Sequence, residues 1–204
     1  MRFVSMLHIG ILVFSEVEVM DFAGPFEVFS IAETNDHNKL CKVFLVAENL
    51  SAVKARNGLM VLPNYDYANC PPIDILIVPG GFGAEELEIK NQTTLSWIKA
   101  KYLEVKHLAS ICTGAFLLAE IGLLDRLDVT THWMDMDTLK NNYPLLDIKE
   151  NVRYTDNGKI LTSGGISSGI HLSFYLLQKL FGLDVAIRTA RRMEYDWNPE
   201  SNRL

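Results

Sequence analysis

The sequence predicts an α/β fold in which a mainly parallel sheet lies between two layers of helices, as a three-layer sandwich. Two observations support this fold class. Short apolar segments alternate along the 204-residue chain with longer segments of helical periodicity. The short segments are apolar at nearly every position, which is typical of parallel strands buried on both faces. No internal repeat or Pro/Gly/Ser-rich linker divides the chain, so we expect one doubly wound domain over residues 1–204.

The expected strands come from apolar runs of strand length. The first run, HIGILVF, opens the series, and the run DILIVPGG ends abruptly in glycine. Between them, Asn57-Gly58 separates two extended pieces, which predicts a hairpin. In chain order, the expected strands lie at 8–14, 42–47, 74–81, 107–111, 152–155 and 160–163.

The expected helices come from longer segments with helical spacing of apolar residues. Leu95, Trp97, Ile98 and Tyr102 mark one such segment, and Gly122 closes another, AFLLAEIG. In chain order, the expected helices lie at about 24–33, 91–102, 115–122, 135–142, 168–181 and 184–195.

The charge and hydropathy of the chain exclude two classes of partner. The formal net charge is −6, from 19 basic and 25 acidic residues, and such a surface repels phosphate backbones. We therefore expect no nucleic-acid binding. No stretch approaches the roughly 18 uninterrupted apolar residues that a membrane span needs, so we expect no membrane partner. The opening segment has a strand-length apolar run and no small-residue cleavage site, so we expect no signal peptide.

The cysteines indicate a reducing environment rather than a disulfide framework. Cys41, Cys70 and Cys112 are odd in number and widely spaced. No C-x-x-C pair is present, so we expect neither a zinc site nor a redox dithiol. These features predict a cytoplasmic protein without a bound metal.

The segment SICTGA predicts a reactive thiol at a sharp turn between a strand and a helix. Cys112 would occupy this turn, and the small residues Gly114 and Ala115 would permit a strained backbone there. At the start of a helix, exposed amides and the helix dipole favour the thiolate form of cysteine. The alternative is a buried free cysteine, which is the commoner state of this residue.

Two further segments could supply groups beside the sulfur. The glycine turn VPGGFG follows a core strand, and the backbone amides of Gly81 and Thr113 could stabilise negative charge next to Cys112. Asp21 lies beyond the first strand and could exchange a proton with a substrate. The alternative for Asp21 is a helix N-cap or a solvated loop carboxylate.

Two histidines are candidate auxiliary residues. His132, in TTHW, could end a strand at the same edge of the sheet and orient the site. His171 opens a late helix. Either could equally be a structural hydrogen-bonding residue.

Taken together, the runs resemble the ThiJ/PfpI superfamily, whose fold is related to class I glutamine amidotransferases, and most closely its isonitrile hydratase group. The resemblance rests on DILIVPGG, ASICTGAFLLAEIGLLD, TTHW, LTSGGISSGI, VMDFAGPFEVF and ARRMEYDWNP. It implies a flavodoxin-like sandwich, usually a homodimer, with Cys112 as nucleophile and Asp21 near the sulfur. It also implies oxyanion-type amides at Gly81 and Thr113 and places His132 near the active site.

The chain departs from two branches of this superfamily. The peptidase branch has histidine directly after the nucleophile, where this chain has Thr113. Glutamine amidotransferases use a late His-x-Glu pair, whereas Leu172 and Ser173 follow His171. Proteolysis and glutaminase activity therefore lack their usual bases.

The resemblance predicts a cysteine-dependent lyase that hydrates a small isonitrile to an N-substituted formamide, without a metal or cofactor. Glyoxalase or deglycase chemistry at the same cysteine is one alternative. A non-catalytic domain that senses a ligand or the redox state is another, since an accessible thiol serves all three.

Overall fold

The computed structural model describes residues 6–203, so the first five residues of the opening segment lie outside the described part. Its main element is a seven-stranded sheet. The strands are β1 (Leu7–Leu12), β2 (Cys41–Ala47), β5 (Tyr65–Asp66), β6 (Ile75–Val78), β7 (His107–Ile111), β10 (Tyr154–Asp156) and β11 (Ile160–Ser163). Their order is β10-β11-β7-β6-β1-β2-β5, and every pair is parallel except β10 with β11.

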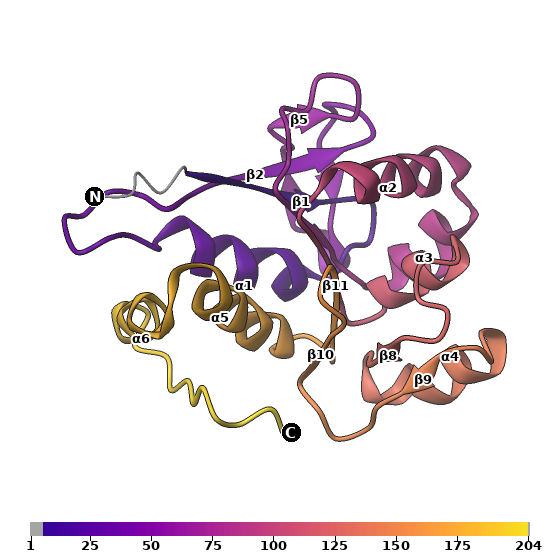
Figure 1. Cartoon of the computed structure of the whole chain (residues 1–204). Coiled ribbons are helices and arrows are strands. Elements are labelled where there is room, and N and C mark those ends of the chain that lie inside the picture. Colours follow the sequence, from indigo (N-terminus) through magenta and orange to yellow (C-terminus); the bar gives the residue numbers. More distant parts are fainter. Residues whose placement is uncertain (1–5, 204) are drawn as a thin grey trace.

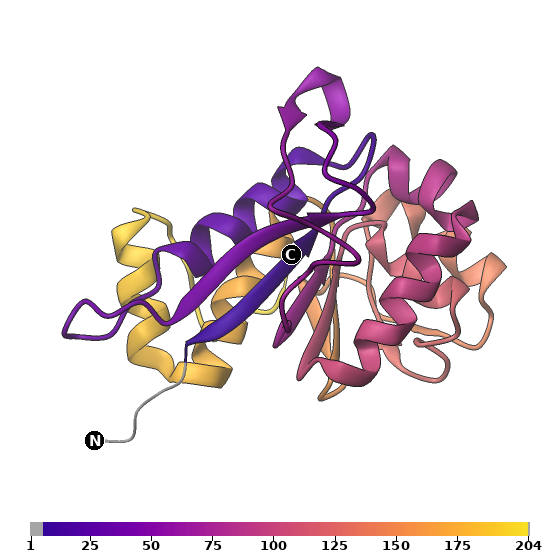
Figure 2. The same ribbon diagram turned by 90° about the horizontal axis from the view of Figure 1, so that it is seen from above.

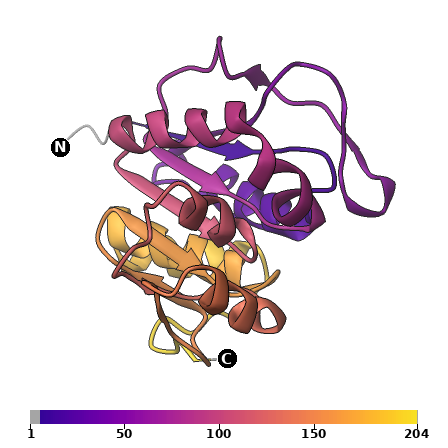
Figure 3. The same ribbon diagram turned by 90° about the vertical axis from the view of Figure 1, so that its right-hand side faces the viewer.

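Helices cover both faces of this sheet. On one face, α1 (Val19–Ser30) packs on β1, β2 and α5 (Ser168–Phe181), and α6 (Leu183–Arg192) packs on α5. On the other face lie α2 (Gln92–Glu104) and α3 (Gly114–Glu120), with α4 (Met136–Asn142) beyond them (Figures 1 and 2). Figure 3 shows α2, α3 and α4 in front of the sheet. The predicted three-layer α/β sandwich with a mainly parallel sheet is confirmed.

The central strands form the core, which explains their continuous apolar sequences. All four residues of β6 are buried, and Ile9 and Ile11 of β1 are fully buried. Because helices cover both faces, side chains pointing either way along these strands leave water. None of the helices formed by residues 6–203 is long and apolar enough to cross a bilayer.

Two boundaries differ from the sequence prediction in ways that affect the site. Helix α1 begins at Val19 rather than near residue 24, so Asp21 lies in its first turn and Pro25 lies inside it. Strand β6 ends at Val78, so the glycines that follow form a loop. Gly81 has a φ of 111°, which a strand cannot accommodate.

The predicted hairpin at Asn57-Gly58 is confirmed. β3 (Val53–Lys54) pairs antiparallel with β4 (Met60–Val61). Asn57 and Gly58 both have positive φ, of 58° and 93°, as tight hairpin turns require. The hairpin stands out from the sheet in Figure 2, and the Arg56 amide donates to the Val17 carbonyl at 3.0 Å. This bond ties the tip of the hairpin to the start of α1.

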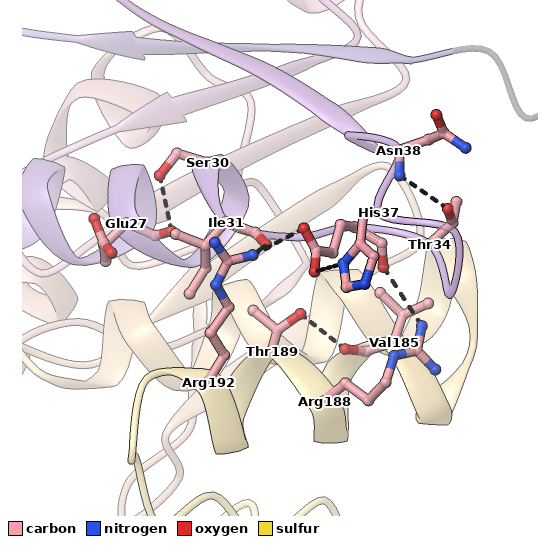
Figure 4. Close-up of polar contacts among 11 residues, drawn as sticks. Glu27, Ser30, Ile31, Thr34, His37, Asn38, Val185, Arg188, Thr189 and Arg192 are labelled. Atoms are coloured by element: carbon pink, nitrogen blue, oxygen red, sulfur yellow. Dashed lines mark hydrogen bonds and ion pairs between the residues drawn. The ribbon is translucent and has the colours of Figure 1, made fainter.

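Polar contacts between α6 and the segment after α1 hold the helix layer together (Figure 4). Arg192 Nη1 donates to the Ile31 carbonyl at 3.1 Å and lies 2.9 Å from Glu33 Oε2. Arg188 Nη2 donates to the Glu33 carbonyl at 3.4 Å. The arginines therefore bind one carbonyl at the C-cap of α1, which the helix itself leaves unpaired, and one carbonyl just after it.

Candidate active site

Cys112 occupies a sharp turn between β7 and α3. Its φ of 54° is left-handed, an uncommon conformation for a residue other than glycine. Its amide faces the carbonyl oxygens of Ser163 and Gly164, each at 3.2 Å, and its carbonyl accepts from Thr131 Oγ1 at 2.8 Å. The turn predicted from SICTGA is therefore present, and hydrogen bonds from β11 and from the segment after β8 (Asp128–Val129) hold it.

Small residues let the neighbouring loops approach this turn. A Cβ added at Gly114 would collide with the Val78 carbonyl oxygen, which is backbone and cannot swing aside. A Cβ at Gly80 would collide with the backbone nitrogen of Thr113. The loop after β6 can contact the turn only because both positions are glycine.

Asp21 is completely buried beside the sulfur. Its Oδ2 accepts a hydrogen bond from the Gly80 amide at 2.9 Å, whereas Oδ1 has no hydrogen-bond partner among the described residues. Burial raises the pKa of Asp21 to about 8; the Gly80 hydrogen bond opposes this rise, and the charge of Glu18 adds to it. Asp21 is therefore mainly a neutral carboxylic acid at pH 7, not a solvated loop carboxylate or an N-cap.

The Cys112 thiol is only 6% exposed, and its surroundings favour the protonated form. Burial raises the pKa of Cys112, and the nearby Asp21 raises it further. Backbone hydrogen bonds from Thr113 and Ile166 lower the pKa but do not outweigh burial. The expectation of a resting thiolate is wrong for this arrangement, because desolvation and the nearby Asp21 raise the pKa by more than the two backbone hydrogen bonds lower it.

A cavity of about 300 Å³ opens above the sulfur. Most of its lining residues come from segments at the carboxyl ends of the parallel strands, where such sheets gather ligands. They are Glu18, Arg56, Gly81, Glu85, Cys112, Thr113, His132, Met134, Asp135 and Ile166. Larger cavities of about 320 and 480 Å³ lie elsewhere, but neither is lined by a cysteine. Chemistry rather than size therefore identifies the candidate site.

The two predicted oxyanion groups differ in how they are used. The Gly81 amide donates to Thr113 Oγ1 at 2.9 Å, so it already has a partner. The Thr113 amide instead reaches the sulfur of Cys112. Both residues line the cavity, and their stabilisation of developing charge stays a prediction.

The two predicted histidines lie in different places. His132 lines the cavity, with Nδ1 3.2 Å from Asp135 Oδ2 and its ring against Gly165. It follows β8, which pairs with β9 (Asp147–Ile148) in a separate small sheet rather than joining the main one. His171 does not line the cavity.

His171 is a buried residue of α5 with a structural contact. Its Nε2 is 2.9 Å from the Tyr195 hydroxyl, and Nδ1 has no partner among the described residues. Burial lowers the pKa of His171 to about 4, with a smaller contribution from Arg153. His171 is thus neutral at pH 7 and joins α5 to the segment after α6.

The structure adds cavity residues that sequence reasoning missed. Glu85 comes from a single π-helical turn, η2 (Gly83–Leu87), Arg56 from the hairpin tip, and Ile166 from the loop after β11. A signal for Ile166 was available, since Gly164-Gly165 follows a core strand just as Gly80-Gly81 does. Within residues 6–203, no cluster of three or more His, Cys, Asp or Glu side chains is arranged to hold a metal ion.

Comparison with known proteins gives consistent matches. Residues 8–179 match the model of the DJ-1/PfpI family. The isonitrile hydratase of Pseudomonas putida is 33% identical over 189 residues, covering 93% of this chain and 78% of that protein. A ThiJ/PfpI family protein from Pseudomonas syringae superposes with a TM-score of 0.83 at 26% identity, covering 97% of this chain and 78% of that one.

A relative of another class also matches. The HTH-type transcriptional regulator GbdR of Pseudomonas aeruginosa is 23% identical over 188 residues, covering 92% of this chain. The match covers 50% of the regulator, so the chain spans about half the length of this relative.

Proposed function

Because this chain belongs to the DJ-1/PfpI family, we propose that Cys112 and Asp21 are the catalytic pair of an enzyme that hydrates a small isonitrile to an N-substituted formamide. The observation that carries the proposal is the buried, unpartnered Oδ1 of Asp21 beside the thiol. A neutral acid in that position has a proton to give, and the Cys112 thiol is the side chain beside it. The P. putida relative, an isonitrile hydratase, supports this choice of substrate.

The first step adds the thiol across the terminal carbon of the isonitrile. The sulfur of Cys112 forms a C–S bond while Asp21 gives its proton to the same carbon, and the thiol proton passes to Asp21. The product is a thioimidate, and the carboxyl is protonated again at the end of the step. No resting thiolate is required, which agrees with the raised pKa values of both groups.

The second step returns the enzyme to its starting state. Water attacks the thioimidate carbon, giving a proton to one oxygen of Asp21 while the carboxyl protonates the imidate nitrogen. The tetrahedral adduct then collapses: the C–S bond breaks, the carbonyl forms, and Asp21 passes the hydroxyl proton to sulfur. The Thr113 amide would stabilise charge that develops near the sulfur, and Gly81 would do so after its bond to Thr113 Oγ1 opens.

The experiment is a panel of isonitriles and reactive aldehydes incubated with the purified protein. Formamide release and a trapped Cys112 adduct detected by mass spectrometry are expected with isonitriles. The Cys112→Ala variant should lose turnover, and retained activity in it would refute the nucleophile. Turnover of aldehydes alone would instead support glyoxalase or deglycase chemistry at the same pair.

A ligand-sensing domain is the second candidate. Its support is the match to about half of a transcriptional regulator. A sensor would bind a small molecule saturably, without product formation, and isothermal titration beside the turnover assay separates the two candidates.

Two properties of the working protein belong to the same proposal. We expect a homodimer, as the family resemblance implies, which light scattering tests. We also expect a reducing, cytoplasmic setting, which suits the three free cysteines.

A further inference from the structure

The cavity above Cys112 is rich in carboxylates, and two of them lie beside basic side chains, of which the histidine is charged only when protonated. Glu18 Oε2 lies 3.6 Å from Arg56 Nε, and Asp135 Oδ2 lies 3.2 Å from His132 Nδ1. The third carboxylate, Glu85, has no basic side chain within ion-pair distance among residues 6–203. Three carboxylates of the lining face one arginine, so the lining has an excess of negative charge, and Glu85 is the carboxylate that has no close basic partner in the described part of the chain.

Glu85 is held in place by the turn that contains it. Its π-helical turn is anchored at Gly83, whose amide donates to the Glu16 carbonyl at 3.1 Å. A Cβ at Gly83 would collide with the Ser15 carbonyl, so the turn packs directly on the backbone after β1. Single π-helical turns of this kind are frequent at functional sites.

The next residue provides a contrast within the same turn. Glu86 is exposed, does not line the cavity and lies 3.1 Å from Lys90 Nζ. Glu85 is half-buried and faces the site. Burial raises the pKa of Glu85, and the Thr113 hydroxyl lowers it by hydrogen bonding; the charge of Asp135 raises this pKa, and that of Arg56 lowers it. A positive group entering the cavity would favour the charged form of this carboxylate.

We propose that Glu85 is the residue that selects ligands of Cys112 by charge, so that the substrate carries a cationic group, such as a primary ammonium, away from its reacting carbon. Anionic compounds are disfavoured at the same position. The isonitrile part of this assignment rests on the proposed function, whereas the charge preference applies to any electrophile that reaches the sulfur. A cavity of about 300 Å³ limits the substrate to a small molecule.

The test compares two methanethiosulfonates of similar size, one bearing trimethylammonium and one bearing sulfonate. Each reacts with Cys112 to form a mixed disulfide and release methanesulfinate. Peptide mass spectrometry follows Cys112 separately from Cys41 and Cys70. After correction by the ratio for a small free thiol, we expect the cationic reagent to react about tenfold faster at low salt.

Variants at neighbouring positions make the test specific. Glu85→Gln should lower the corrected ratio towards one, whereas Glu86→Gln should leave it unchanged. Glu85→Asp, which keeps the charge, should retain most of the preference. A change in the acidity of Cys112 alters both reaction rates together, so it leaves their ratio unaffected. An unchanged ratio in Glu85→Gln, or an equal loss in Glu86→Gln, would overturn the assignment.

A second measurement separates this proposal from the hydratase proposal. Isonitriles bearing an amine, no charge or a carboxylate are compared in the turnover assay. If none is hydrated while the labelling ratio depends on Glu85, the hydratase proposal fails and charge selection stands. If all three are hydrated equally and the ratio is flat, charge selection fails and the hydratase proposal stands.

Discussion

The backbone amide of Ile166 lies close enough to the sulfur of Cys112 to lower the pKa of the thiol, and both residues are left-handed, with φ of 48° and 54°. One follows β11 and the other follows β7, so two neighbouring strand ends each contain a strained residue. A β-branched side chain at positive φ is rare and costs on the order of 1–3 kcal/mol. The strained backbone at Ile166 thus positions the amide of this residue beside the Cys112 thiol.

Ile166→Asn should stabilise the protein by about 0.5–1 kcal/mol, because asparagine tolerates the left-handed region better than isoleucine does. Ile166 is 40% exposed, so the loss of apolar burial offsets only part of this gain. Urea unfolding measures the difference. Ile166→Val is the control: it remains β-branched and should give no gain. Equal stabilisation in both variants would show that backbone strain is not the cause.

Asp21→Asn should reduce kcat by roughly 10²–10⁴-fold, because an amide cannot relay a proton between substrate and sulfur. The pH profile gives a second readout. The reaction needs protonated Asp21, whose pKa is raised to about 8, so wild-type activity should fall as pH rises through that value. If the residual activity of Asp21→Asn still falls as pH rises through about 8, another group causes the pH dependence.

Gly114→Ala should destabilise the protein by about 3 kcal/mol or more, because the new methyl group meets the fixed carbonyl of Val78. Gly122, which follows the C-cap of the same helix, is the matched control. It has a φ of 72° and open space around it, so Gly122→Ala should cost only about 1–2 kcal/mol of left-handed strain. Thermal or urea unfolding compares them. Similar costs at both sites would contradict the close approach of β6 to the turn.

His171 should make stability depend on pH in the acid range. Its folded pKa is lowered to about 4 from 6.5, so the unfolded chain takes up a proton first as pH falls. The contribution of neutral His171 to the free energy of unfolding is present above pH 6.5 and is lost as pH falls from 6.5 to 4; it amounts to about 3 kcal/mol. His171→Gln cannot titrate and should lose less stability over this window. If the free energy of unfolding of wild type and variant changes with pH in the same way, His171 is not the cause of the pH dependence.

The elements with strong local signals were predictable from the sequence. The helix expected at 168–181 coincides with α5, because its apolar spacing is regular over its whole length. The turn at Cys112 was also predictable, since a strand, a cysteine, a small residue and a helix follow one another directly. For these two features, the residues that are neighbours in the sequence were sufficient for the prediction.

Features that depend on distant segments were not predictable. Pro25 suits the first turn of a helix, so the sequence pattern places the start of α1 too late. Glu85 and Arg56 reach the cavity from a π-helical turn and a hairpin, and neither has a local pattern that points to the sulfur. The protonation of Cys112 depends on burial by several elements, whereas the helix start that suggested a thiolate is local.

The unpartnered Oδ1 of Asp21 also affects the difference in stability between the free protein and the protein with a bound small molecule. An interior polar atom without a hydrogen-bond partner weakens a fold by about 1–3 kcal/mol. Any ligand that forms a hydrogen bond with this oxygen removes part of the penalty, and its other contacts stabilise the protein further. The melting temperature should therefore rise more with small hydrogen-bonding compounds than with apolar ones of equal size, and a thermal-shift screen can find such guests before the reaction is known.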